Sequence, residues 1–180
     1  MPDSNVLETE RLILRPTALA DFEPWCEMMA DEDTARFIGG VQSPSMAWRA
    51  VMSMAGAWQL TGVAMFSVIE KATGDWVGRL GPWRPHGWPG TEVGWSLSRK
   101  AWGKGYATEG AAAAIDYAFD TFGWDEVIHC IDPANIASRR VAERLGSRLL
   151  RMDRCPPPFD ADEIQIWGQT RGEWQARKGG

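Results

Sequence analysis

Two glycines on either side of a lysine have the spacing in this chain that most directly suggests chemistry. Gly103 and Gly105 lie in a short segment, Trp102 to Ala107, between a strand-like run and an apolar helical pattern. Such a loop presents backbone N–H groups at a helix N-terminus, where they can bind an anion. Glycine has no side chain to keep a phosphate away from the backbone. The segment therefore predicts a site for a phosphorylated cofactor beside a strand edge.

Two other phosphate-binding motifs fit this segment less well. A Walker loop needs Ser or Thr directly after Gly-Lys, but Gly105 follows Gly103 and Lys104. A dinucleotide fingerprint needs a third glycine three residues after the second, and Thr108 stands there. That fingerprint also follows the first strand of its unit, whereas this loop lies past mid-chain. A P-loop nucleotide enzyme is therefore disfavoured, and ATP binding would revive it.

The cysteines and histidines suggest little further chemistry. Cys26, Cys130 and Cys155 lie far apart without C-x-x-C spacing, and the chain has only two histidines. We therefore expect no disulfide framework and no metal site. An acyl-enzyme on Cys130 is disfavoured because no partner base is evident and a buried strand cysteine is common. Its neighbour His129 is expected to be structural.

Apolar periodicity predicts the elements that must position the loop. Strand-like runs bounded by Gly and Pro alternate with runs whose apolar residues recur at helical spacing. Strands are expected near residues 8–15, 63–70, 75–82, 91–98, 126–131, 149–153 and 163–170, and helices near 19–29, 44–58, 105–122 and 135–145. Ser43-Pro44 is a strong helix start, and Gly146 is a helix stop. This order predicts an α/β protein with a mixed sheet and helices on its faces.

Length and composition limit the class of protein. The chain has 180 residues, of which 44% are hydrophobic and 24% charged, and this fits one globular domain. We place that domain at residues 8–170 and expect a polar tail, able to form a short helix, over 171–180. The net charge of −5 argues against nucleic acid or an anionic membrane as a partner. The polar N-terminus and the absence of an apolar run of ~18 residues favour a cytoplasmic protein.

Tryptophan is unusually frequent. The chain has eleven, and five of them cluster in the middle third: Trp76, Trp83, Trp88, Trp95 and Trp102. One interpretation is that they are large core and edge residues. The other is that some of them line an acceptor pocket, since indole faces suit cationic amines.

Three segments, together with the order of the predicted strands and helices, resemble the GNAT superfamily of acyl-CoA N-acyltransferases. They are WGKGYATEG at 102–110, NIASRRVAERLG at 135–146 and TERLILRP at 9–16. The closer likeness is to the Rim-type branch, which includes acetyltransferases of ribosomal-protein N-termini. The resemblance covers roughly residues 8–170. It implies the GNAT fold, an α/β fold with a mixed central sheet of six to seven strands, helices on both faces, and a splay between the fourth and fifth strands.

The same resemblance implies acetyl-CoA as the co-substrate and no metal. Its pyrophosphate would lie on the loop, and its pantetheine arm would pair with the strand at 91–98 as an added strand does. The loop residues concerned are Trp102, Gly103, Lys104, Gly105, Tyr106 and Ala107, and the strand residues are Trp95, Leu97 and Ser98. The superfamily usually has Gln or Arg in the first loop position. Trp102 stands there instead, as is common in the Rim-type branch.

Acyl transfer to an amine needs a base, because an ammonium group must lose a proton before it can attack. Glu92 is the best candidate, directly or through water. It shares a strand face with Gly94 and Ser96, Gly94 leaves space beside it, and the resemblance supports a carboxylate here. Glu92 could instead only pair with an arginine, and Asp160 and Glu163 are weaker alternatives. A change of Glu92 to Gln is expected to lower kcat most at low pH, where the amine is most protonated.

The start of the helix at 135–145 could supply the acid for the leaving thiolate. Asn135 is either a helix N-cap or, by resemblance, a contact of the cofactor arm. Many GNAT enzymes use a tyrosine seven residues later, but Ala142 stands there. The Rim-type pattern instead proposes a serine three residues after the Asn, and Ser138 stands there. Its hydroxyl is a weak acid and could act mainly as a hydrogen-bond donor.

The sequence thus predicts direct acetyl transfer from acetyl-CoA to a primary amine of a protein N-terminus or a small molecule. The alternative is a catalytically inactive acyl-CoA-binding sensor or interaction module. Retention of Glu92, Asn135 and Ser138 argues against it. We expect the acceptor pocket to be built from the first two helices and the loops at 83–89 and 155–162. Both a monomer and a homodimer are compatible with the sequence.

Overall fold

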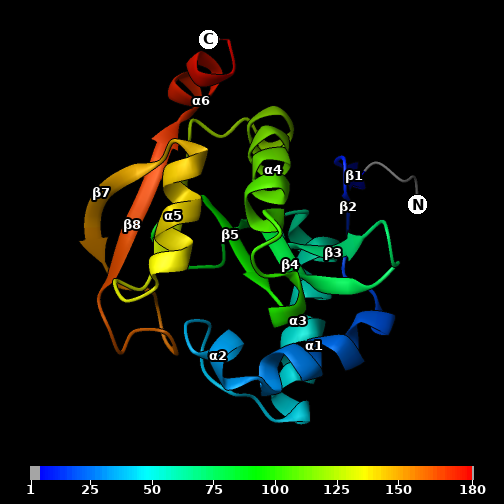
Figure 1. Ribbon diagram of the computed structural model, residues 1–180. Helices are drawn as coiled ribbons and strands as arrows, with labels where there is room; N and C mark the ends of the chain where they lie inside the picture. The colour runs from blue at the N-terminus through cyan, green and yellow to red at the C-terminus, as the bar shows by residue number, and fades with distance from the viewer. Residues whose placement is uncertain (1–4, 180) are drawn as a thin grey trace.

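The computed structural model describes residues 5–179, and eight strands in it form one sheet in the order β1-β2-β3-β4-β5-β6-β8-β7 (Figure 1). The strands are β1 (Leu7–Glu8), β2 (Leu12–Arg15), β3 (Phe66–Glu70), β4 (Trp76–Trp83), β5 (Glu92–Leu97), β6 (Glu126–Ile131), β7 (Arg148–Asp153) and β8 (Ile164–Thr170). The helices are α1 (Phe22–Ala30), α2 (Glu32–Ala35), α3 (Pro44–Thr61), α4 (Tyr106–Phe122), α5 (Ile136–Leu145) and α6 (Arg171–Lys178), with 3-10 turns at Leu19–Asp21 and Arg99–Ala101. Residues 1–4 of the polar N-terminus and residue 180 of the expected tail lie outside the described residues.

The strand count exceeds the six to seven expected because the first predicted strand folds back on itself. The Thr9 N–H donates to the Leu12 carbonyl at 2.9 Å, which closes a turn between β1 and β2. Leu7 then pairs with Leu14 in antiparallel register. Polar residues at 8–11 interrupt the apolar run, and the chain reverses there.

Helix boundaries follow the expected capping residues. The Ser43 side chain accepts a hydrogen bond from the Met46 N–H, and Pro44 occupies the first turn of α3. The Asn135 side chain caps α5, and Gly146 ends it in the left-handed conformation. These residues satisfy or remove the N–H and C=O groups that a helix end leaves unpaired.

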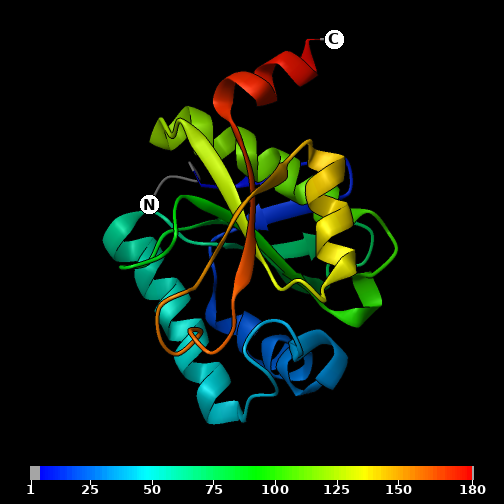
Figure 2. The same ribbon diagram turned by 90° about the vertical axis from the view of Figure 1, so that its left-hand side faces the viewer.

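Two hydrophobic cores lie on the two faces of the sheet. Successive residues of β3 and its approach alternate between them: Phe66 and Val68 pack in the core under α4, while Met65 and Ile69 pack against α1 and α3. Strand side chains alternate between faces, so each core needs its own helical cover. Figure 2 shows α3 and α5 on opposite sides of the sheet. The predicted α/β architecture with helices on both faces is confirmed.

A bulge in β4 changes which side chains face α1. Val77 has no partner on β3, because Trp76 and Gly78 pair with successive residues there. Gly78 has φ +144°, and a β carbon on it would lie 2.4 Å from a backbone oxygen of β5. Val77 packs in the α4 core, whereas the Arg79 guanidinium lies over the Trp25 ring of α1. The bulge thus puts Val77 and Arg79 on opposite faces.

The expected splay lies between β5 and β6. These two parallel strands share one paired position, Glu92 with Ile128, whereas β4 and β5 pair along their whole length from Trp83–Glu92 to Gly78–Leu97. Beyond Glu92 the β5 edge therefore faces a gap rather than a neighbouring strand.

The polar tail expected after residue 170 forms α6. The Thr170 side chain and Glu173 form a capping box at its start. Trp174 is buried in the core, and its indole N–H donates to Asp116 at 2.7 Å. Within residues 5–179, no helix combines the length and the hydropathy needed to cross a bilayer.

Candidate active site

The edge of β5 that faces the gap has free backbone groups. The Ser98 N–H donates to Val77 of β4 at 2.9 Å. Because hydrogen-bonded positions alternate along an antiparallel pair, the backbone groups of Trp95 and Leu97 point the other way, into the gap. The Leu97 carbonyl accepts from the Trp102 indole at 2.8 Å. Of the three strand residues proposed to hold a cofactor arm, Trp95 and Leu97 face the gap, while the N–H of Ser98 is already used.

The glycine loop lies at the open end of that gap and starts α4. Gly103 and Gly105 have φ of +73° and +81°, and a β carbon on Gly103 would meet nothing within 4 Å. Within the described chain, the N–H groups of residues 103–108 have no protein acceptor. This row of unused donors at a helix N-terminus fits the pyrophosphate expected there.

The side chains of the loop point away from its N–H groups and fix its position. The Lys104 ammonium pairs with Glu70 at 2.9 Å, and the Tyr106 hydroxyl donates to the same carboxylate at 2.6 Å. Hydrogen bonds from Tyr106, Lys104 and Thr73 lower the pKa of Glu70 to about 2. The ammonium group of Lys104 is therefore paired with Glu70, while its backbone N–H is one of the unused donors of the loop.

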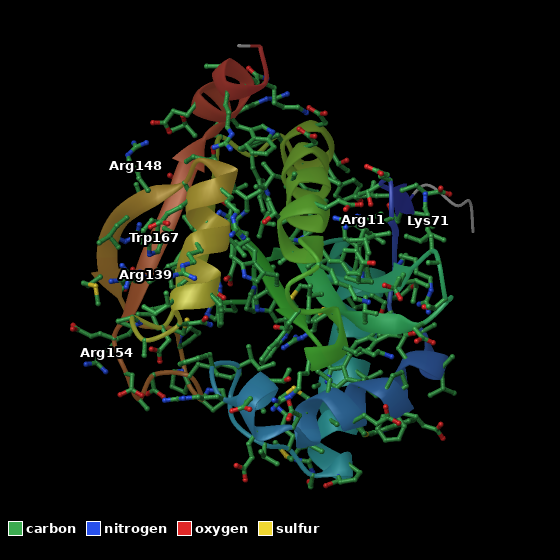
Figure 3. All side chains as sticks on the ribbon, viewed as in Figure 1. Arg11, Lys71, Arg139, Arg148, Arg154 and Trp167 are labelled. Carbon is green, nitrogen blue, oxygen red and sulfur yellow. The ribbon has the colours of Figure 1, made fainter. Side chains whose placement is uncertain are left out.

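Arg11 secures the loop from the β2 side (Figure 3). Its guanidinium donates to the Lys104 carbonyl at 2.9 Å and pairs with Glu109 of α4 at 2.6 Å. It also lies 4.8 Å from the centre of the Tyr106 ring. The opening segment 9–16, part of the family resemblance, thus contacts the loop itself.

Ser138 reaches the gap from α5. Asn135 caps the helix by accepting from the Ser138 N–H at 3.0 Å, so its N-cap role is confirmed. The Trp95 indole donates to the Ser138 hydroxyl oxygen at 3.2 Å. Because an indole N–H can only donate, Ser138 accepts here and its own proton is free for another acceptor. Ala142, where many family members have a tyrosine, is buried in the core.

Glu92 lies at the vertex of the splay and is 5% exposed. Its Oε1 accepts from the Cys130 N–H at 3.0 Å, and its Oε2 accepts from the Trp88 indole at 2.5 Å. Burial raises the pKa of Glu92 to about 7, although both hydrogen bonds and the charge of Arg79 oppose the rise. A carboxyl group with this pKa exchanges a proton readily near neutral pH.

Gly94 makes the space that Glu92 needs. A β carbon on Gly94 would lie 3.2 Å from Glu92 Oε1 and 2.7 Å from Met65 Cε. Glu92 and Gly94 also line a cavity of about 370 Å³ on the α1–α3 face of the sheet, together with Ser96. The three residues on one strand face therefore form the floor of a pocket.

The walls of this cavity come from distant segments. Trp83, Trp88 and Trp95 line it, whereas Trp76 is in the core and Trp102 is half-exposed outside it. The tryptophans are thus divided between the core and the lining of this cavity. The loops at 83–89 and 155–162 contribute as expected. The first two predicted helices do not line it; residues 36–40, which follow α2, take that place.

The other candidate groups are less suited to catalysis. Asp160 and Glu163 are exposed and lie outside the cavity lining. His129 is buried, its Nδ1–H donates to the Val93 carbonyl at 2.6 Å, and burial lowers its pKa to about 4. A hydrogen bond with Cys155 is the main cause that raises the pKa of the Cys130 thiol far above its usual range, and burial is the second cause. His129 is therefore structural, and Cys130 is a poor nucleophile.

Sequence reasoning missed the hydrogen-bond donors to Glu92 and the arginines of the cavity. Trp88 lies in a loop without a motif, and the Cys130 contribution is a backbone N–H. Arg79 and Arg36 line the cavity from β4 and from the segment after α2. Of these missed residues, only Trp88 had a sequence signal, as a member of the tryptophan cluster.

Comparisons with known proteins agree with this geometry. A model of the acetyltransferase (GNAT) domain matches residues 11–148. The uncharacterised N-acetyltransferase p20 of Bacillus licheniformis is 30% identical over 143 residues, which cover 78% of this chain and 80% of p20. The crystal structure of an acetyltransferase from Agrobacterium tumefaciens is 30% identical, covers 95% of each chain and superposes with a TM-score of 0.79.

Two further matches are partial. The uncharacterised protein YkkB of Bacillus subtilis is 38% identical over 87 residues, 47% of this chain and 51% of YkkB. The FsC-acetyl coenzyme A-N(2)-transacetylase of Aspergillus fumigatus is 38% identical over 89 residues, 47% of this chain and 37% of that protein. In these two cases the match spans about half or less of the relative.

Proposed function

Because this chain belongs to the GNAT family of acetyltransferases, we propose that it transfers an acetyl group from acetyl-CoA directly to a primary amine. The observation that carries this proposal is the splay of β5 from β6. It has unused N–H donors at its open end and the buried carboxyl group of Glu92, with a pKa of about 7, at its vertex.

The residues present fit acetyl-CoA. The N–H groups of residues 103–108 would hold the pyrophosphate, and the β5 backbone at Trp95, with the N–H of Leu97, would pair with the amides of the pantetheine arm. The side-chain oxygen of Asn135 already caps α5, so Asn135 would contact that arm through its other polar atoms. The acetyl end of an arm in the gap would point toward Glu92 and the cavity.

The chemistry needs two proton movements on the protein. Acetyl-CoA supplies an activated thioester, whose carbon–sulfur bond breaks as the nitrogen–carbon bond forms. Glu92, in its ionised form, accepts the proton that the ammonium must lose before attack, directly or through water. Ser138 donates its free hydroxyl proton toward the sulfur, which leaves as a thiol, and water restores the serine. The amide nitrogen releases its second proton to solvent.

The class of amine stays open between two sources. The Rim-type likeness favours a protein N-terminus as the acceptor. The other source is a small molecule; the partial match to an enzyme named as an N(2)-transacetylase supports nitrogen as the acceptor atom in either case. A cavity of about 370 Å³ can accept either a compact amine or the first residues of a peptide.

Two measurements test the proposal. Isothermal titration should detect acetyl-CoA binding, and no binding up to about millimolar concentration would contradict it. Detection of free thiol across a panel of amines, amino acids and peptide N-termini should show transfer above the rate of hydrolysis. Binding without transfer to any amine would instead favour an acyl-CoA-binding module.

A further inference from the structure

The cavity in front of Glu92 contains a guanidinium group that no protein carboxylate contacts. Within residues 5–179, the side chain of Arg79 makes no hydrogen bond and no ion pair, and its Nε is buried without an acceptor. Burial lowers the pKa of Arg79 to about 10, and the charge of Glu92 opposes this shift. A buried charge is costly unless it is paired, so Arg79 lacks a partner that its surroundings call for.

The fold holds Arg79 in this position. The bulge at Gly78 turns it toward the cavity, and the Trp25 ring supports its guanidinium at 4.8 Å. Arg79 pairs in register with Ser96, four residues along β5 from Glu92, which is roughly 13 Å of strand. The two charged groups thus share one sheet face and one cavity but make no ion pair.

Arg79 and Glu92, which lie four strand positions apart, mark two ends of the cavity. Arg36 lines the same cavity from the segment after α2, and its guanidinium likewise makes no ion pair within the described residues. Glu92 lies at the other end, and Asp132 and Asp162 line the side nearest β6 and β8. An occupant that matches both ends carries a positive and a negative group.

From this charge layout we propose that the acceptor amine also carries a carboxylate, and that Arg79 binds this carboxylate while Glu92 receives the amine. The inference rests on the proposed function and specifies its substrate class. A planar guanidinium binds a carboxylate through two parallel hydrogen bonds. Such a contact would satisfy the buried Nε side of Arg79 and fix the amine relative to Glu92.

The test compares amines that differ only in the negative group. Glycine, β-alanine, 4-aminobutanoate and several α-amino acids are each paired with their primary amide, and O-phosphoethanolamine is added as a phosphate-bearing amine. We expect kcat/KM for the best acid to exceed that of its amide by at least about 30-fold. Equal rates for acid and amide in the unmodified protein, or a preference for the phosphate, would overturn the proposal.

Variants then assign the effect to Arg79. Arg79→Gln should abolish the preference for the acid, and Arg79→Lys should keep part of it because the charge remains without the fork geometry. Arg84→Gln is the matched control, since Arg84 is exposed just beyond the same strand and lies outside the cavity lining. A preference that survives in Arg79→Gln contradicts the assignment. The comparison of acid and amide needs no variant, so a misfolded variant does not decide it.

A binding measurement separates this inference from the proposed function. The same acids and amides are titrated into the protein with CoA and followed by tryptophan fluorescence. Tighter binding of the acid, lost in Arg79→Gln, supports the carboxylate site even if no amine is acetylated. Acetylation of amines with no preference for a carboxylate supports the enzyme and rejects the site.

Discussion

The two ends of the splay differ in how they are built. The cofactor end uses backbone N–H groups of one continuous segment, residues 103–108, and its charged side chains are paired at the surface. The proposed acceptor end has side chains from separate segments, where the buried Glu92 and the half-buried Arg79 make no ion pair. Under the proposed function, a cofactor common to the family would be held by local geometry, while the choice of acceptor would depend on side chains brought together by the fold.

Glu92→Gln should have the largest effect and fall on the acceptor end alone. We expect kcat to drop by about 100-fold or more, with unchanged acetyl-CoA affinity. The pKa of about 7 reverses the pH dependence expected from the sequence, because Glu92 is itself protonated at low pH. The ratio of wild-type to variant kcat should therefore rise with pH through about 7. A ratio that is largest at low pH would remove Glu92 as the base.

Glu92→Gln should lower activity relative to wild type as pH rises, but over the same range it should raise the relative stability of the folded protein. The folded-state pKa of Glu92 lies above its ordinary value of 4.5, so ionisation disfavours the folded state. Its favourable contribution is complete below about pH 4.5 and is lost as pH rises through about 7. Thermal melts should show Glu92→Gln gaining stability relative to wild type between these values. A constant difference across pH would contradict the raised pKa.

Ser138→Ala should have the next largest effect on kcat. It tests whether Ser138 donates a proton to the thioester sulfur, where the cofactor end and the acceptor end would meet. Loss of a proton donor to the sulfur should lower kcat by about 30-fold, less than for a full general acid, since a serine hydroxyl is weakly acidic. Acetyl-CoA affinity, measured by titration, should stay within about twofold. A loss of affinity with unchanged kcat would make Ser138 a positioning residue.

Gly103→Ala should affect only the cofactor end. Alanine at φ +73° costs about 1–2 kcal/mol, and relaxation of the loop would turn its N–H groups away. The acetyl-CoA Kd should rise by about 10-fold, with an unchanged pH profile of kcat. Gly123→Ala is the matched control, because Gly123 has φ +64° at the far end of α4. An equal loss of affinity in both variants would point to general destabilisation.

Arg11→Gln should have the smallest effect, again at the cofactor end. It removes the contacts with the Lys104 carbonyl and Glu109, but exposed pairs contribute little, so we expect a rise in acetyl-CoA Kd of about threefold. Lys71→Gln is the control, since Lys71 pairs with Glu8 on the same sheet edge and does not contact the loop. A similar change in both titrations would show a general charge effect.

Much of the fold could be predicted because its signals are local. Ser43, Asn135 and Gly146 mark helix ends through hydrogen bonds within a few residues, and the sequence order of strands fits the observed splay. The extra strand was missed because β1 is two residues long and gains its place only by pairing with β2. The cofactor loop could be located for the same local reason, since its glycines act through the backbone beside them.

The acceptor end was only partly predictable. Glu92 was found from strand periodicity and the family likeness, but its raised pKa comes from burial, which the hydrogen bonds from Trp88 and Cys130 only partly offset. These donors lie 4 and 38 positions away in sequence. Nothing in the spacing of Arg79 indicated a role, because strict alternation from Val77 puts it in the core under α4.

The sequence by itself thus determined the elements, the cofactor loop and the strand that carries the base, because turns, caps and periodicity act over a few residues. The tertiary structure decided what Glu92 and Arg79 can do. The bulge at Gly78 changes the face of the sheet on which Arg79 lies, and burial raises the pKa of Glu92. Burial and bulge placement depend on neighbours far along the chain, and for that reason the raised pKa of Glu92 and the position of Arg79 could be found only after the chain was folded.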